Sequence, residues 1–225
     1  MKSIAYMRSD IKEKFGAPRQ GVLAPHVRGQ IIFEKEYRDP EAFRGLEEFS
    51  HIWLIWLFSE SMGRWSPTVR PPRLGGNRRV GVFACRSPFR PNPIGLSCVK
   101  LDQIDWHAAD GPVLHVSGTD LIDGTPILDI KPYLSSADCI PGALEGFAGK
   151  TAMDILPVLF LPQAEDALPG EQKQAVAELL SLDPRPRYHH DPERIYGMKY
   201  SRYNVRFRVA DRHVEVIDAE LAGTP

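Results

Sequence analysis

The stretch of the chain best suited to chemistry is RSPFRPNPIG, residues 86–95. Its three prolines fix φ and remove backbone donors, so much of the ordering entropy of this loop is lost before any ligand binds. Arg86 and Arg90 offer planar forks for a carboxylate or a phosphate, and Asn92 offers both a donor and an acceptor. Gly95 permits a close backbone approach or a positive φ. These residues predict a preorganised loop that binds an anion or a polar ligand.

Two further stretches present polar side chains next to apolar segments. APRQG, residues 17–21, is expected to hold Arg19 and Gln20 in a turn. In FSHIWLIWLFSE, His51 opens an apolar strand and Ser59–Glu60 close it. A histidine beside a strand is more often a structural donor than a catalyst.

The stretch DLIDGTPILDIKPY, residues 120–133, places Asp120, Asp123 and Asp129 around Gly124 and Pro126. This pattern is typical of a turn in which Asp side chains bond to the backbone. By itself it predicts a turn and no chemistry.

Several common site motifs are missing from the sequence. It has no GxGxxG, no GxxxxGK[ST], no GxSxG and no HExxH, so the usual dinucleotide, P-loop, serine-hydrolase and zinc-protease sites are not expected. The adjacent pair His189–His190 lacks the i, i+4 spacing of helical metal ligands, and no metal site is predicted. Three cysteines without a CxxC pair indicate buried thiols in a reducing compartment.

Charge is distributed unevenly along the 225 residues, although the net charge is −1. Residues 61–101 hold seven arginines and one lysine with no acidic residue, and residues 185–208 hold six arginines and one lysine against two acids. Aromatic residues accompany both basic clusters, for example Trp65, Phe89 and Tyr203. Arginine beside aromatic rings favours phosphate contact with base stacking, so an anionic partner such as RNA is favoured over a merely solvated surface.

Short β-strands are expected to position these residues. Apolar alternation and Gly/Pro turns predict strands at residues 3–9, 28–34, 51–58, 78–84, 95–104, 112–121 and 126–133. One helix, residues 39–49, is expected to begin at Asp39 as N-cap with Pro40 at its first position. The short, irregular spacing indicates an antiparallel barrel or sandwich and not a βαβ sheet.

The C-terminal third has a different composition. Gly/Pro/Ala-rich stretches predict a domain of residues 1–145, a linker at 146–165 and an α+β domain at 166–225. A helix is expected at residues 170–183, with Ala175, Val176, Leu179 and Leu180 facing inward. A hairpin is expected from YNVRFRVA and HVEVIDAEL around Asp211–Arg212. No apolar run approaches the ~20 residues that span a bilayer, and the N-terminus lacks a signal-peptide pattern, so a cytoplasmic protein is expected.

Six blocks of the sequence, taken in order, resemble one known family. GVFACRSPFRPNPIGLS (81–97) is similar to the signature of the TsaA-like family, the TrmO-type tRNA methyltransferases. The family's other blocks resemble PRQ, GLEEFSHIWLIWLF, PTVRPPRLGG, DLIDGTPILDIKPY, and DPRPRY followed by YNVRFRV. Nearly the whole chain is covered, and six ordered blocks are far more specific than a lone RPNP. Relatives often differ at Cys85 and Pro88.

The resemblance implies a mainly β enzyme that uses S-adenosylmethionine on a β-barrel, with a small α+β C-terminal domain. It implies methylation of N6-threonylcarbamoyladenosine at position 37 of a tRNA, beside the anticodon and usually in a threonine tRNA. It also implies a homodimer. Two other hypotheses stay open: an S-adenosylmethionine enzyme acting on another nucleoside or small molecule, and an RNA-binding module without catalysis.

The resemblance also suggests roles for individual residues. Expected to hold S-adenosylmethionine are Pro18, Arg19, Gln20, Ser59, Glu60, Arg86, Leu96, Asp123, Gly124, Thr125, Pro126 and Ile127. Expected to line the reaction pocket are Arg90, Asn92 and His51. Expected to contact the modified adenosine or the anticodon loop are Asp183, Arg185, Tyr196, Tyr200, Asn204 and Arg206.

Overall fold

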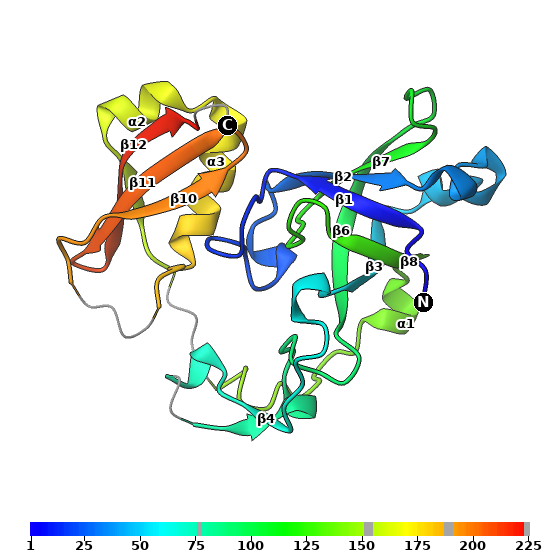
Figure 1. Cartoon of the computed structure of the whole chain (residues 1–225), viewed down its shortest axis with the longest axis horizontal. Helices are drawn as coiled ribbons and strands as arrows, with labels where there is room; N and C mark the ends of the chain where they lie inside the picture. The colour runs from blue at the N-terminus through cyan, green and yellow to red at the C-terminus, as the bar shows by residue number, and fades with distance from the viewer. Residues whose placement is uncertain (76–77, 151–154, 187–190, 223–225) are drawn as a thin grey trace.

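Two β-sheets organise the chain, and each lies against its own apolar core (Figure 1). The computed structural model describes residues 1–75, 78–150, 155–186 and 191–222. Gly76 and Arg187–Tyr188, at the ends of two of the family blocks, and the pair His189–His190 lie outside the described residues. No helix among the described residues has the length and apolar character needed to cross a membrane.

The first sheet is a closed antiparallel barrel with the strand order β1-β2-β7-β6-β3-β8. Its strands are β1 (Ala5–Ser9), β2 (Arg28–Phe33), β3 (His51–Leu57), β6 (Ile94–Asp105), β7 (Val113–Ser117) and β8 (Pro126–Pro132). Each of these strands lies within or overlaps a predicted one. The predicted antiparallel barrel is therefore confirmed.

Strand β3 shows why the sequence forms this barrel. Alternate side chains of HIWLIWL, those of Ile52, Leu54 and Trp56, are buried in the interior, while the residues between them are more exposed. A period of two residues places one set of side chains in a common core. Strand β3 pairs with β6 on one side and β8 on the other, so this core receives side chains from three adjacent strands.

Gly95 lets the RSPFRPNPIG loop enter the barrel. It is the second residue of β6 and lies directly opposite Trp56, and a Cβ added at Gly95 would lie 2.2 Å from a ring carbon of that indole. The residue therefore serves close approach and not a positive φ. The Trp56 side chain, only 8% exposed, fills the space that a larger residue would need.

Two predicted elements are wrong. Residues 39–49 form two short 3₁₀ turns, η3 (Pro40–Phe43) and η4 (Leu46–Glu48), and not one helix. Asp39 does cap the first turn by accepting the Glu41 N–H at 3.0 Å, but Gly45 adopts a φ of 84° and breaks the helical path.

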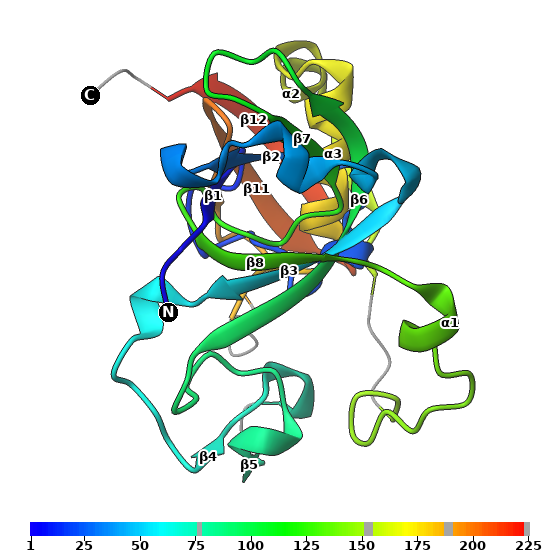
Figure 2. The ribbon, with the colours of Figure 1, turned by 90° about the vertical axis from the view of Figure 1, so that its right-hand side faces the viewer.

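The predicted buried strand at 78–84 is also wrong. It contains the two-residue β5 (Val80–Gly81) followed by the 3₁₀ turn η7 (Val82–Ala84), and Phe83 is 76% exposed. These residues belong to an arm, defined here as residues 58–93, that projects from the barrel between β3 and β6 (Figure 2). The arm also holds η5 (Ser59–Ser61), β4 (Thr68–Val69) and η6 (Pro72–Leu74).

The second sheet has the order β10-β11-β12-β9. Its strands are β9 (Val158–Phe160), β10 (Tyr196–Tyr200), β11 (Tyr203–Ala210) and β12 (His213–Leu221). Strands β11 and β12 form the predicted hairpin. Asp211 and Arg212 at its turn have φ values of 47° and 63°, the pair of positive values that a type I′ turn requires. Strand β9 lies within residues 146–165 and runs parallel to β12.

Helix α3 (Gly170–Ser181) covers one face of this sheet, and the four side chains expected to face inward are all buried. The shorter α2 (Pro162–Ala167) packs nearby, with Ala164 buried. A third short helix, α1 (Ser135–Asp138), lies beside the barrel (Figure 1).

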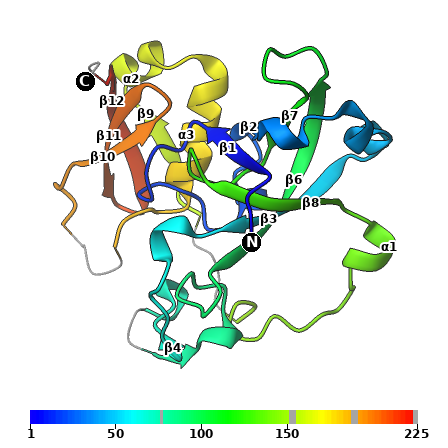
Figure 3. The same cartoon turned by 45° about the vertical axis from the view of Figure 1, so that its right-hand side comes forward.

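Residues 10–27, the connection between β1 and β2, lie between the two sheets (Figure 3). Although they leave a barrel strand, Ile11, Ala24 and Val27 are buried in the core of the second sheet. Backbone bonds fix this position: the N–H of Ser201 donates to the Asp10 carbonyl at 2.7 Å, and that of Lys199 donates to the Glu13 carboxylate at 3.0 Å. The connection therefore belongs structurally to both parts of the chain.

Replacement of Gly95 by alanine should lower the free energy of unfolding by about 1–3 kcal/mol, because the added methyl group overpacks against the Trp56 ring. Gly81→Ala is the matched control. Gly81 has a φ of −59°, and no described atom lies within 4 Å of its added Cβ. Urea unfolding of both variants tests this prediction. An equal decrease in the free energy of unfolding of the two variants would contradict it.

Candidate active site

The connection at residues 10–27 receives a side-chain contact from each of three separate blocks that were expected to hold a cofactor. The Arg86 guanidinium donates to the Gln20 side-chain oxygen. Glu60 forms an ion pair with Lys14 at 2.6 Å, and Asp123 forms one with Lys12 at 3.0 Å. Three segments that are far apart in the sequence thus each contact residues 10–27.

The turn at residues 18–21 lies at the centre of this meeting point. Pro18 is buried, and the Gln20 amide nitrogen donates to the Arg19 carbonyl at 2.6 Å. Gly21 lies so close to the Gly118 carbonyl oxygen that a Cβ would come within 1.9 Å of it. The next turn, η1 (Gly21–Leu23), contacts β6, the strand whose Leu96 side chain is 54% exposed. An exposed apolar surface therefore lies on the strand that this polar turn contacts.

Asp120 joins this site, although its sequence context predicted only a turn residue. Its carboxylate accepts the Ser97 hydroxyl at 2.6 Å, and Ser97 in turn accepts the Trp56 indole N–H at 3.0 Å. The backbone of Gly21 and the guanidinium of Arg86 also face the carboxylate. Burial raises the pKa of Asp120, while these hydrogen bonds and the Arg86 charge oppose the rise.

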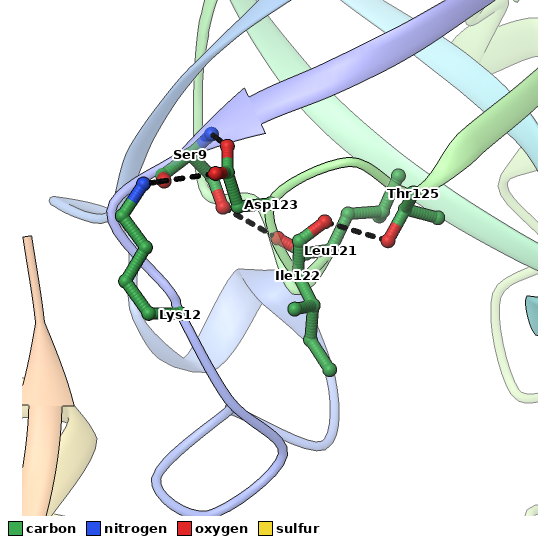
Figure 4. Close-up of polar contacts among 6 residues, drawn as sticks. All are labelled: Ser9, Lys12, Leu121, Ile122, Asp123 and Thr125. Atoms are coloured by element: carbon green, nitrogen blue, oxygen red, sulfur yellow. Dashed lines mark hydrogen bonds and ion pairs between the residues drawn. The ribbon is translucent and has the colours of Figure 1, made fainter. Parts of the chain in front are cut away.

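The Asp123 turn is held rigidly by its own side chains (Figure 4). Asp123 accepts the Ser9 N–H at 2.9 Å in addition to the Lys12 ion pair, and Gly124 has a φ of 78°. The Thr125 hydroxyl donates to the Ile122 carbonyl at 2.6 Å. Both Asp123 oxygens are thus used by the protein itself, which indicates that this carboxylate shapes the turn.

Two other residues of the same block lie in the barrel. Pro126 pairs with Tyr6 of β1, and Ile127 pairs with Ala5. The Ile127 side chain is fully buried in the barrel core. Any contact that Ile127 makes with a ligand would therefore come from its backbone.

The prolines and Arg90 together fix the RSPFRPNPIG loop. One Arg90 nitrogen donates to the carbonyls of Val82 and Cys85 at 3.0 and 2.7 Å, and the guanidinium lies 5.6 Å from the centre of the Phe83 ring. Asn92 is exposed beside it. These two residues line a surface depression of about 310 Å³ with Phe83 and Pro91. Arg90 thus acts as a clamp within the loop and leaves Asn92 accessible.

The structure does not bring His51 to this loop within one chain. His51 opens β3 opposite Lys100, whereas Leu57 at the far end of β3 lies opposite Ile94, next to the loop. His51 and Leu57 are six positions apart along the strand, which corresponds to roughly 20 Å at the usual rise per residue. The His51 ring instead lies against Tyr133.

Four of the six residues expected to contact tRNA fall on the two faces of the second sheet, and Asp183 and Arg185 precede it. Tyr196 and Tyr200 are 7% and 2% exposed, and Tyr196 stacks on Phe207 in the core. Burial also raises the pKa of Tyr200. Asn204 and Arg206 point to the opposite, more exposed face of β11. The structure thus leaves two of these four side chains accessible.

Arg185 and Arg206, the two arginines among these expected contacts, are paired with carboxylates. Arg185 makes a two-pronged ion pair with Asp183 at 2.8 and 3.0 Å. Arg206 pairs in the same way with Asp218 and also lies 3.5 Å from Glu220. These carboxylates raise the pKa of both arginines. No group of three or more His, Cys, Asp or Glu side chains in the described part of the chain is arranged to hold a metal ion.

Family models match almost the entire chain. The model of the tRNA-methyltransferase O N-terminal domain matches residues 6–139, and the model of the TrmO C-terminal domain matches residues 154–222. The chain belongs to the TrmO family. The family resemblance found from the sequence blocks is thereby confirmed.

TrmO relatives with curated names are similar over most of their length. A tRNA (adenine(37)-N6)-methyltransferase of Escherichia coli strain K12 is 42% identical over 97% of this chain and 97% of its own. A second, from Eikenella corrodens, is 44% identical over 77% of this chain and 98% of its own. Pseudomonas aeruginosa RcsF is 43% identical over 87% of this chain and 86% of its own, and its name places it among S-adenosylmethionine-dependent methyltransferases.

A solved TrmO structure has the same fold. The crystal structure of TrmO from Pseudomonas aeruginosa matches with a TM-score of 0.79 and 34% identity, over 97% of this chain and 96% of that chain. The barrel and the smaller mixed sheet thus both have counterparts in a known TrmO.

Asp120→Asn should change the pH dependence of the free energy of unfolding of this chain. Because the pKa of Asp120 is raised above its ordinary value of 3.8, the unfolded chain loses this proton first. The parent should therefore lose stability relative to the variant as pH rises from about 4 through the folded-state pKa, and the difference should then stay constant. Urea unfolding from pH 4 to 8 measures this difference. A free energy of unfolding that rises with pH more in the parent than in the variant would contradict the prediction.

Proposed function

We propose that this chain transfers a methyl group from S-adenosylmethionine to N6 of the adenosine at position 37 of a tRNA. The named relatives support the activity and the cofactor. The observation on the molecule itself that carries the proposal is the meeting of Arg86, Glu60 and Asp123 on residues 10–27. These contacts place three sequence blocks that are far apart in the chain at one shared location.

The cofactor suits the groups gathered around Gln20. S-adenosylmethionine supplies an electrophilic methyl group when bound, and it carries a carboxylate, an ammonium group, ribose hydroxyls and an adenine. Arg86 offers a cation for the carboxylate, and the amide of Gln20 offers a donor and an acceptor. The exposed Leu96 side chain offers apolar surface, and Asp120 offers a carboxylate for a hydroxyl or an ammonium group.

The remaining pocket residues supply alignment. Methyl transfer is an in-line displacement, which depends more on fixed geometry than on covalent help. Arg90 and three prolines hold the loop that presents Asn92. The exposed Asn92 amide can accept a hydrogen bond from, or donate one to, a nucleobase beside the cofactor. Here the rigidity of the loop would raise the rate by positioning the acceptor.

The finer proposal is that the acceptor nucleoside is N6-threonylcarbamoyladenosine, in a threonine tRNA. Its N6 lies between a purine and a carbonyl, so the nitrogen is a weak nucleophile while its proton is comparatively acidic. A polar group that stabilises the deprotonated ureide would then suffice. The threonyl carboxylate needs a cation, and an arginine can bind it with two parallel hydrogen bonds.

We also propose that the enzyme works as a homodimer in the cytoplasm. Cys85, Cys98 and Cys139 are all free thiols, which fits a reducing compartment. His51 lies on a different part of the barrel surface from Asn92, so a second copy could bring a His51 to the pocket. Sedimentation velocity measures the oligomeric state, and a monomer at micromolar concentration would exclude the dimer.

Arg86→Ala should raise the Kd for S-adenosylmethionine by at least tenfold in isothermal titration calorimetry, because a charge-assisted contact is worth about 1.5–3 kcal/mol. Arg44→Ala is the matched control, since Arg44 is also exposed but pairs with Glu41 on a distant 3₁₀ turn. Unchanged affinity in the Arg86 variant would remove this residue from the site.

Nucleoside mass spectrometry of bulk tRNA tests the reaction. A strain that lacks the gene should lose N6-methyl-N6-threonylcarbamoyladenosine and accumulate the unmethylated nucleoside, and complementation should restore the product. An unchanged profile would instead favour another acceptor.

A further inference from the structure

The two basic clusters of the sequence differ in how many carboxylates lie near their arginines. In the C-terminal cluster, carboxylates pair with Arg185, Arg206 and Arg208, the last through Glu215 at 2.6 Å. In the arm, residues 61–93 contain no acidic residue at all. The arm therefore carries positive charge that no acidic residue of its own balances.

Three arginines of the arm are available to a partner. Arg64, Arg70 and Arg78 are exposed, and none of them forms an ion pair with any residue that the structure describes. The one acidic residue at the base of the arm, Glu60, is paired with Lys14. A surface with several cations and no nearby anion creates a local positive potential that attracts a polyanion.

Aromatic side chains accompany these arginines. Trp65 is 57% exposed, Phe83 is 76% exposed and Phe89 is 41% exposed. Exposed rings beside guanidinium groups can stack on unpaired bases while the cations contact phosphates. Three large aromatic side chains exposed to solvent on one arm indicate a surface that binds a partner.

The arm is also fixed in place before any partner binds. The Phe58 N–H donates to the Pro93 carbonyl at 2.8 Å and closes its base. The Ser66 N–H donates to the Phe89 carbonyl at 3.2 Å, and the Val82 N–H donates to the Pro67 carbonyl at 3.0 Å. These bonds fix the described parts of the arm before a partner binds, which reduces the entropy cost of binding.

We propose that the arm is the surface on which the phosphates and unpaired bases of the tRNA anticodon arm dock. This inference rests on the proposed function, since it concerns the same substrate. It assigns phosphate binding to Arg64, Arg70 and Arg78 and base stacking to Trp65. The arm ends in the RSPFRPNPIG loop, so an anticodon loop that lies on it would bring its nucleosides towards Asn92.

A second copy of the chain fits this surface less well. Facing arms would bring two sets of unpaired arginines together, and burying them without carboxylates is costly. RNA supplies the negative charge that the arm lacks.

The main test compares two triple variants by fluorescence anisotropy with purified threonine tRNA at 50–200 mM salt. R64Q/R70Q/R78Q should raise the Kd at least tenfold and make the slope of log Kd against log salt shallower by about 2–3, since each lost phosphate contact removes about 0.7–0.9. The matched control R28Q/R44Q/R208Q removes three arginines that pair with Glu171, Glu41 and Glu215, and it should change the Kd less than threefold.

Trp65→Ala separates stacking from charge. It should raise the Kd severalfold while leaving the salt slope unchanged, because a lost base contact releases no counterions. In both arm variants the Kd for S-adenosylmethionine should match that of the parent, which shows that the fold and the cofactor site remain intact.

Four outcomes would overturn the inference. They are equal losses of affinity in the two triple variants, an unchanged Kd and slope in the arm variant, an unchanged Kd in Trp65→Ala, or a change of oligomeric state that accompanies the loss of tRNA binding. A parent that binds S-adenosylmethionine but neither binds nor methylates tRNA would overturn the proposed function itself.

Discussion

The packing of residues 10–27 between the barrel and the second sheet determines where the candidate site forms. Ile11, Ala24 and Val27 are buried with the second core, while Lys12, Lys14 and Gln20 reach back to the barrel and the arm. Burial of the apolar side chains holds the segment with far more free energy than its exposed ion pairs could supply. The buried apolar side chains therefore fix the position of the segment, and this fixes the positions of the polar side chains that make the contacts of the site.

Local sequence pattern revealed the barrel strands but not the arm. Strands β3 and β6 alternate so regularly that their inward faces could be read directly from HIWLIWL and GLSCVKL. The stretch RRVGVFA also contains closely spaced apolar residues but lies outside the barrel, and its exposed Phe83 cannot be distinguished by residue type from a buried one. Likewise the Asp39 cap was predictable, whereas the break at Gly45 depends on a backbone angle that the sequence does not specify.

The candidate site was predictable as a set of blocks but not as a set of contacts. Arg86 and Gln20 are 66 positions apart, and Ser97 and Asp120 are 23 apart, so no local spacing reveals either pair. The same limit applies to charge. The sequence shows two basic clusters, but only the fold shows that Asp218, on the neighbouring strand, neutralises Arg206. Long-range pairing therefore decides which arginines are free to bind an anion.

The position of β10 to β12 at the end of the chain has a consequence for synthesis on the ribosome. Strand β8 completes the barrel at Pro132, yet the surface that supports Ile11 and Glu13 includes Tyr200 and Lys199, which are made much later. Domains that fold as the chain emerges do so from the N-terminus. The nascent barrel would close while residues 10–27 still lack their contacts with β10 and β11, so the candidate site would take its final form only when translation is almost complete.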